Sequence, residues 1–166
     1  KIKKNEHWYY EMKTLGLNYR LNEIEATLGI SQLKKVKVFN FKRNLIAKKY
    51  RKAFVKTPIK FQSININRYS SYHLFVILFP NHQKILKNYN KIFKEFYKNN
   101  IAVMLHYSPV HLQPFYRKYG FKKDDFPVSE NYAKRAFSIP NFPNLKAVEQ
   151  KNVIKKVFQI LKKFYI

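Results

Sequence analysis

The segment that decides the fold runs from Leu17 to Leu33 and reads LNYRLNEIEATLGISQL. It opens with a polar turn and continues into a helix whose apolar residues recur every three or four positions. Asn22 can cap this helix, because its side-chain oxygen can accept from a backbone N–H two or three residues on, and Glu25 occupies the reciprocal position of a capping box. A rigid polar turn at a helix N-terminus is suited to binding an anion.

The helical pattern continues beyond this segment as far as Phe54, and Pro58 ends it. Gly29 and Ser31 could interrupt the helix, so the pattern predicts either one long amphipathic helix or two nearly collinear ones. The residues expected on its inward face are Leu33, Val36, Phe39, Ile46, Tyr50 and Phe54.

After Pro58 the sequence alternates short apolar runs with helical patterns. Strands are predicted at residues 59–61, 72–79, 101–106 and 137–140. Helices are predicted at residues 85–97, 111–119, 127–136 and 146–164. The run at 72–79 is too continuously apolar for an exposed edge, so we expect a central strand covered on both faces. The order of these elements predicts an α+β domain with a small sheet and helices on one face.

The 166 residues suffice for one domain, since 46% of them are hydrophobic. The net charge of +25 suggests nucleic-acid binding at first, because a basic face releases counterions from phosphates. However, the positive charge is mostly Lys and is spread along every predicted helix, and the abundant Asn, Ile, Phe and Tyr have codons rich in adenine and thymine. We therefore expect salt-dependent adhesion to polyanions but no specific nucleic-acid partner, with a basic α+β binding module for polyanions as the alternative function.

The chain has no cysteine, which excludes disulfides, zinc sites with Cys ligands and thiol catalysis. It contains no run of about 18 uninterrupted apolar residues. Residues 1–6 lead into no apolar signal core. We therefore expect neither a membrane span nor an export signal, and a cytoplasmic location is compatible with the missing cysteines.

The common catalytic motifs are missing, because the three glycines form no dinucleotide fingerprint or P-loop, and neither Gly-x-Ser-x-Gly nor His-Glu-x-x-His occurs. Asp124 and Asp125 are adjacent in a charged loop, where solvation explains them. The remaining candidate is residues 105–111, LHYSPVH, in which two histidines flank a Pro turn. Three interpretations stay open: a metal site, which lacks a third ligand nearby, imidazoles bonded to backbone carbonyls, and contact with a ligand.

Five segments, in order along the chain, resemble the DegT/StrS group of sugar-nucleotide aminotransferases. They are residues 12–33, residues 72–75 (YHLF), residues 106–111 (HYSPVH), residues 126–130 (FPVSE) and residues 138–140 (SIP). The resemblance covers nearly the whole chain, and five ordered motifs are far more specific than any single one.

The resemblance implies a pyridoxal-phosphate (PLP) enzyme of the aspartate-aminotransferase fold, which moves an amino group from glutamate to a UDP-linked 4-keto-6-deoxy amino sugar. It further implies a homodimer with shared active sites. Residues 1–22 would then be a remnant of the large PLP-binding domain, residues 23–56 the connecting helix or helices, and residues 57–166 the small C-terminal domain.

The chain departs from this family at the catalytic centre. The lysine that forms the Schiff base lies in a Ser-x-His-x-x-Lys loop followed by a Thr-Thr-Gly-Glu-Gly run, and this chain has neither motif. We therefore assign no catalytic residue, and we predict that the chain is inactive without the N-terminal large domain.

Few site residues can be carried over from the family. Asn18 matches the position that reaches the cofactor phosphate in the neighbouring subunit, and its alternative role is that of a turn residue in a left-handed conformation. Arg20 can hold a carboxylate or phosphate, with a helix-capping surface salt bridge as the alternative. His106 and Tyr107 match the loop that lines the sugar-nucleotide pocket, and packing is their alternative role. Three further residues lie in the matching segments without an assigned role: His73, His111 and Glu130.

Overall fold

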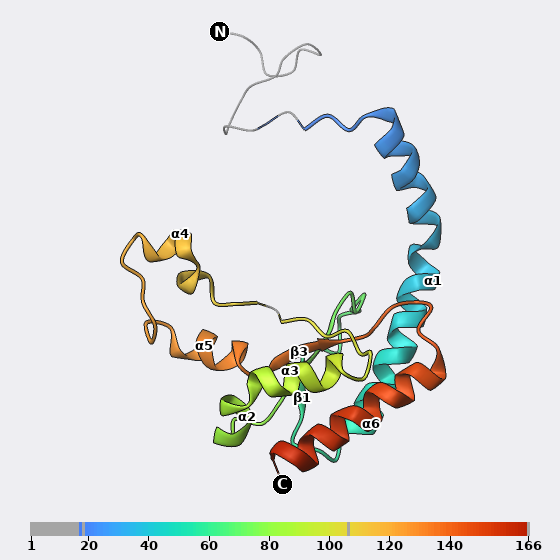
Figure 1. The fold of residues 1–166 in the computed structure, drawn as a ribbon. Helices are drawn as coiled ribbons and strands as arrows, with labels where there is room; N and C mark the ends of the chain where they lie inside the picture. Colours follow the sequence, from blue (N-terminus) through green and yellow to red (C-terminus); the bar gives the residue numbers. More distant parts are fainter. Residues whose placement is uncertain (1–16, 18, 106, 166) are drawn as a thin grey trace. The chain divides into compact units, whose positions relative to one another are not determined.

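The computed structural model describes residues 17, 19–105 and 107–165 of the chain (Figure 1). The chain divides into two compact units, Lys1–Lys35 and Val36–Ile166. The described part of the first unit holds the polar turn and the beginning of helix α1, which runs from Glu23 to Phe54. None of the described helices is both long enough and apolar enough to cross a membrane.

Helix α1 begins with the predicted capping box. The N–H of Glu25 donates to Oδ1 of Asn22 at 2.9 Å, and Oε2 of Glu25 accepts from the N–H of Asn22 at 3.3 Å. The helix is continuous through Gly29, so the prediction of one long helix is the correct one of the two alternatives. Only its last third enters a core, where Ile46, Ala47, Tyr50 and Phe54 are buried.

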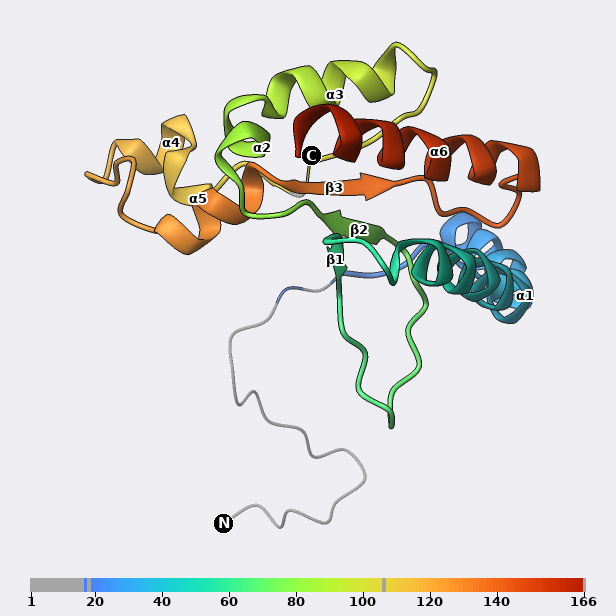
Figure 2. The same cartoon turned by 90° about the horizontal axis from the view of Figure 1, so that it is seen from below.

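The second unit contains a three-stranded antiparallel sheet in the order β1, β2, β3. The strands are β1 (Lys60–Phe61), β2 (Phe75–Leu78) and β3 (Ala136–Ile139). Helices α3 (Tyr89–Tyr97) and α6 (Ala147–Phe164) lie over one face of this sheet (Figure 2). The α+β architecture with a central β2 is thus confirmed.

Strand β2 is buried on one face only. Phe75 and Ile77 are fully buried, whereas Val76 and Leu78 on the opposite face are half-buried. The expectation that both faces are covered was therefore wrong, because no described helix packs over the second face. The continuous apolar run had concealed the alternation that marks a sheet with one partly open side.

Phe137 of β3 joins the sheet to α3. Its ring centroid lies 5.2 Å from that of Tyr89, 5.9 Å from Phe96, 6.5 Å from Phe93 and 5.5 Å from Phe79. Burying an aromatic ring of this size contributes about 1.5–3 kcal/mol, and well-oriented ring pairs add to it. This cluster fixes α3 on the sheet.

Polar contacts tie the end of α1 to α6 and β3. The buried Tyr50 hydroxyl donates to the carbonyl oxygen of Pro140 at 2.9 Å, and its ring lies 5.2 Å from that of Phe75. Burial raises the pKa of this hydroxyl. Nε2 of the buried Gln150 donates to the carbonyl oxygen of Ile46 at 2.8 Å. Each bond gives a buried side-chain donor a partner, which burial would otherwise leave unpaired.

Two predicted elements differ from the structure in the middle of the chain. The predicted helix at 85–97 is divided at Asn88 into α2 (Gln83–Lys87) and α3. The predicted strand at 101–106 is absent from the described residues, where only Met104 pairs with β3, through two hydrogen bonds to Ser138. The buried side chains of Ile101 and Val103 explain the apolar pattern without a strand ladder.

The region between these residues and β3 forms short helical pieces: η1 (Val110–Leu112), α4 (Pro114–Arg117) and α5 (Pro127–Ala133). The predicted helix at 111–119 is interrupted because Gln113, which precedes Pro114, adopts an extended conformation (ψ 144°). The ring of a proline disfavours helical geometry in the preceding residue. Gly120 follows with a φ of 91°, which matches the predicted stop.

Candidate functional site

The polar turn before α1 is exposed where the structure describes it. Asn18, the predicted phosphate contact, lies outside the described residues, whereas Tyr19 is 87% exposed and Arg20 is also exposed. The N–H of Tyr19 donates to the carbonyl oxygen of Leu17 at 3.2 Å. Within the described part of the chain Arg20 makes no ion pair, so its alternative role in a surface salt bridge gains no support.

The second predicted contact region is the loop that follows residues 101–105. His106 lies outside the described residues, and Tyr107 is exposed. The loop leaves the core at Val103 and enters η1 at Val110, so a buried segment anchors one of its ends. Arg20 belongs to the first unit, and Tyr107 belongs to the second.

His111 forms a buried pair that the sequence did not reveal. Its Nε2 lies 2.9 Å from Oε1 of Glu130, and both residues are buried. The same oxygen accepts from the N–H of Asp124 at 2.8 Å, and the ring of Phe126 lies 4.7 Å from the imidazole. The hydrogen bond from His111, helped by backbone N–H groups, lowers the pKa of the Glu130 carboxyl below its ordinary value.

This pair bears on the interpretations of His111 that the sequence left open. Its imidazole meets a carboxylate 19 residues away, which joins η1 to α5. In the described part of the chain, no three His, Asp or Glu side chains are arranged to hold a metal ion. The pair supports a structural role for His111, with Glu130 as the partner in place of the backbone carbonyl of that interpretation. A contact across 19 residues has no local sequence signal.

A small apolar hollow of about 210 Å³ lies beside the loop that carries Tyr107. Its lining includes Leu105, Pro109 and Leu112, and burial raises the pKa of Tyr89 at its edge. This volume is below the roughly 300 Å³ at which small-molecule pockets begin. The hollow is thus too small for a whole cofactor.

The described residues do not form a complete PLP site. Two lysines, Lys123 and Lys134, line the hollow beside Tyr107 together with Glu130. However, both lysines are exposed, and the Glu130 oxygen already accepts from His111 and from the N–H of Asp124. We therefore assign no step of the transfer reaction to these residues.

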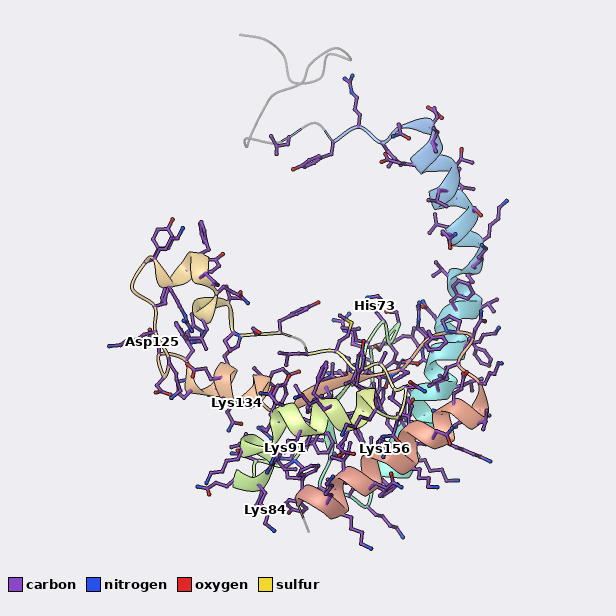
Figure 3. All side chains as sticks on the ribbon, in the orientation of Figure 1. His73, Lys84, Lys91, Asp125, Lys134 and Lys156 are labelled. Atoms are coloured by element: carbon purple, nitrogen blue, oxygen red, sulfur yellow. The ribbon has the colours of Figure 1, made fainter. Side chains whose placement is uncertain are left out.

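A larger groove of about 560 Å³ lies over the partly open face of the sheet. Val76 and Leu78 form part of its lining, together with Tyr132 and the loop at 70–74. His73, which the sequence left without a role, is exposed in this loop before β2 (Figure 3). The continuous apolar sequence of β2 gave no signal for this groove.

The loop that borders this groove is held in a strained conformation. Tyr72 has a φ of 44°, a region that non-glycine residues seldom occupy. Its N–H donates to Oγ of Ser70 at 3.1 Å, and its hydroxyl accepts from Nε of Arg51 at 3.0 Å. Its carbonyl oxygen accepts from Nδ2 of the buried Asn141 at 3.0 Å. Three hydrogen bonds therefore position His73 at the rim of the groove.

Comparison with known proteins gives a consistent result. The model of the DegT/DnrJ/EryC1/StrS aminotransferase family matches residues 1–158. The chain is 34% identical over 165 residues to the UDP-4-amino-4,6-dideoxy-N-acetyl-beta-L-altrosamine transaminase of Campylobacter jejuni, covering 98% of this chain and 43% of the relative. It is 31% identical over 160 residues to the spore coat polysaccharide biosynthesis protein SpsC of Bacillus subtilis, covering 95% of this chain and 41% of the relative.

Among solved structures, Helicobacter pylori PseC, an aminotransferase of pseudaminic acid biosynthesis, matches with a TM-score of 0.76 and 30% identity over 97% of this chain and 43% of PseC. The chain thus spans about two fifths of the length of the relatives it matches.

Proposed function

The chain belongs to the DegT/DnrJ/EryC1/StrS aminotransferase family, and from this premise we propose that it is the C-terminal portion of a PLP-dependent sugar-nucleotide transaminase. The substrate pair is a UDP-linked 4-keto-6-deoxy amino sugar and glutamate, and the product is the 4-amino sugar of a pathway such as pseudaminic acid synthesis. The observation that carries this proposal is the 34% identity to the Campylobacter jejuni transaminase across 98% of the chain.

The chemistry of the reaction is divided between this chain and the part of the enzyme outside it. PLP, when bound, acts as an electron sink for the carbon that gains or loses the amino group. The sequence holds no lysine in a Ser-x-His-x-x-Lys context, so the lysine and the acidic partner of the pyridine nitrogen come from the large domain. The chain alone is then inactive.

The proposed contribution of this chain is to bind and orient. Asn18 reaches the cofactor phosphate of a neighbouring subunit, and Arg20 holds a carboxylate or phosphate of the substrate. The capping box of Asn22 and Glu25 supports this role, because it fixes the backbone immediately after an exposed arginine. His106 and the exposed Tyr107 line the sugar-nucleotide pocket from the second unit.

A homodimer with shared active sites is part of the proposal. Helix α1 exposes eight large apolar side chains before its buried third, which is unusual for a helix with no partner. They are Ile24, Leu28, Ile30, Leu33, Val36, Val38, Phe41 and Leu45. A partner subunit and the large domain would cover them in the full enzyme.

The proposal is tested by complementation. The chain is mixed with a separately produced N-terminal part of the Campylobacter jejuni transaminase, with PLP, glutamate and the UDP-keto sugar. We expect cofactor absorbance and amino transfer from the mixture, and borohydride treatment of the chain alone should trap no PLP on any single lysine. Arg20→Ala should lower transfer strongly, whereas Arg68→Ala, at another exposed arginine, should not.

A mixture that gives neither cofactor absorbance nor transfer, while the chain binds DNA with sequence preference at physiological salt, would favour the basic polyanion-binding module instead. Full transfer by the Arg20→Ala variant would remove Arg20 from the site without touching the family assignment.

A further inference from the structure

A second groove, of about 540 Å³, lies at the end of β2, where the turn after the strand meets Arg135 in the segment that follows α5. Its volume falls within the roughly 300–1,000 Å³ of small-molecule sites. It is lined by Lys60, Asn81, His82, Arg135 and Tyr165, together with Pro58, Phe79 and Pro80. No carboxylate is among these lining residues.

Arg135 is fixed in this groove by the backbone and by a neighbouring amide. Its Nε donates to Oδ1 of Asn131 at 2.7 Å, and its Nη1 donates to the carbonyl oxygen of Phe79 at 3.1 Å. The N–H of Phe79 in turn donates to the carbonyl oxygen of Arg135 at 2.9 Å. The guanidinium is therefore held in one orientation before any ligand arrives.

The other polar groups in the groove are held so that donors remain for a ligand. Oδ1 of Asn81 accepts from Nδ2 of Asn131 at 2.8 Å, which leaves the Asn81 amide nitrogen as its remaining polar group. Nδ1 of His82 accepts from the N–H of Lys84 at 3.3 Å, so the neutral ring carries its hydrogen on Nε2. Oδ1 of Asn81 and Nδ1 of His82 are thus engaged inside the network, and the donors Nδ2 of Asn81 and Nε2 of His82 remain for a ligand.

The arginine distinguishes this groove from the generally basic surface. The chain contains 28 lysines but only six arginines, so composition alone does not explain an immobilised arginine in a groove. A guanidinium fork matches the oxygens of a phosphoryl group better than an ammonium does. Lys60 of β1, which pairs with Leu78 of β2, adds a second permanent positive charge to the groove.

We propose that this groove binds the phosphoryl group of a small organic phosphate. Arg135, His82 and the Asn81 amide donate to the phosphoryl oxygens, and Lys60 adds electrostatic attraction. The organic part lies against Pro58, Pro80 and Tyr165, whose ring packs edge-on against His82 at 5.3 Å. The site is separate from the transfer reaction proposed above and does not depend on it.

The test is a calorimetric titration of the full 166-residue chain with inorganic pyrophosphate at about 0.15 M salt, followed by NMR of the His82 ring. Lys60→Glu and Lys84→Glu make the same change of charge, but only Lys60 lines the groove, while Lys84 projects from the exposed side of α2 (Figure 3). His82→Asp is a second probe, because Asp retains the capping acceptor for α2 and puts a negative charge among the donors.

We expect saturable binding of one pyrophosphate with a shift of the His82 resonances. Lys60→Glu should weaken binding by roughly tenfold or more, because it reverses a charge a few ångströms from the ligand. Lys84→Glu should weaken it far less, and His82→Asp should abolish it while the circular dichroism stays unchanged. Equal losses in Lys60→Glu and Lys84→Glu would overturn the proposal, as would absence of saturation up to about 10 mM pyrophosphate.

Discussion

Asn22→Ala should loosen the first turn of α1 without unfolding the rest of the chain. The substitution removes one hydrogen bond, from the N–H of Glu25 to Oδ1 of Asn22, because the reciprocal bond uses the backbone N–H of residue 22. Loss of an N-cap of this kind costs about 1 kcal/mol. A change of 1 kcal/mol raises the population of the open first turn about fivefold.

The assay is amide hydrogen exchange of the first turn of α1, read residue by residue with NMR. Exchange at Ala26, whose N–H donates to the carbonyl oxygen of residue 22 at 2.9 Å and keeps this acceptor in the variant, should accelerate about fivefold. The buried amides of the second unit should keep their protection, because the substitution lies in the first unit. Asn22→Asp is the matched control, because Asp retains the accepting oxygen. The amides of the first turn in this variant should exchange at the parent's rates. Equal exchange in all three proteins would refute the reasoning that the cap fixes the turn next to Arg20.

Three further predictions concern the second unit. Phe137→Ala should lower the free energy of unfolding by about 3–5 kcal/mol in urea titrations, because it leaves a cavity among four rings. Tyr50→Phe should lower the same quantity by about 1 kcal/mol, since the Pro140 carbonyl loses its donor. The pKa of Glu130 is lowered in the folded state, so its pair with His111 stabilises the fold above the ordinary carboxyl pKa of 4.5 and loses this effect as the pH falls. Urea titrations at several pH values should therefore show that the difference in unfolding free energy between the parent and Glu130→Gln shrinks as the pH is lowered.

The features that could be predicted from the sequence depend on residues that are close together along the chain. The cap of α1 depends on Asn22 and Glu25, three residues apart, and both of its hydrogen bonds are present. The interruption at Gln113 also has a local cause, in Pro114, although the prediction of one helix at 111–119 did not include it. At 101–105 the apolar pattern was read as a strand, although burial of Ile101 and Val103 alone produces the same pattern.

The polar networks could not be predicted, because their partners are far apart in the sequence. His111 meets Glu130 across 19 residues, and Arg135 meets the carbonyl oxygen of Phe79 across 56. Hydrophobic periodicity carries no information about which polar groups become neighbours when the sheet forms. The family resemblance supplied Asn18, Arg20, His106 and Tyr107, but it supplied neither of these networks.

Helix α1 links the packing of the chain to its proposed role. Its last third is stabilised by the core through Ile46, Tyr50 and Phe54, whereas the residues from Ile24 to Leu45 expose eight large apolar side chains. A helix without tertiary contacts is only marginally stable in water. Covering each Leu, Ile, Val or Phe contributes about 1.5–3 kcal/mol. Covering most of the eight would therefore offset the roughly 4–15 kcal/mol lost on association.

The same cover would hold the Asn22 cap and the exposed Arg20 in place. In the proposed homodimer, cover of α1 by a partner would thus support the residues proposed to contact the shared site. This coupling predicts that Leu28→Asp, which places a charge among the exposed apolar side chains on the Leu28 side of α1, should prevent association in the complementation mixture. Sedimentation of the mixture measures this directly, and Lys35→Asp, at an exposed polar position of the same helix, is its control. Unchanged association of the Leu28→Asp variant would show that this face is not the one that a partner covers.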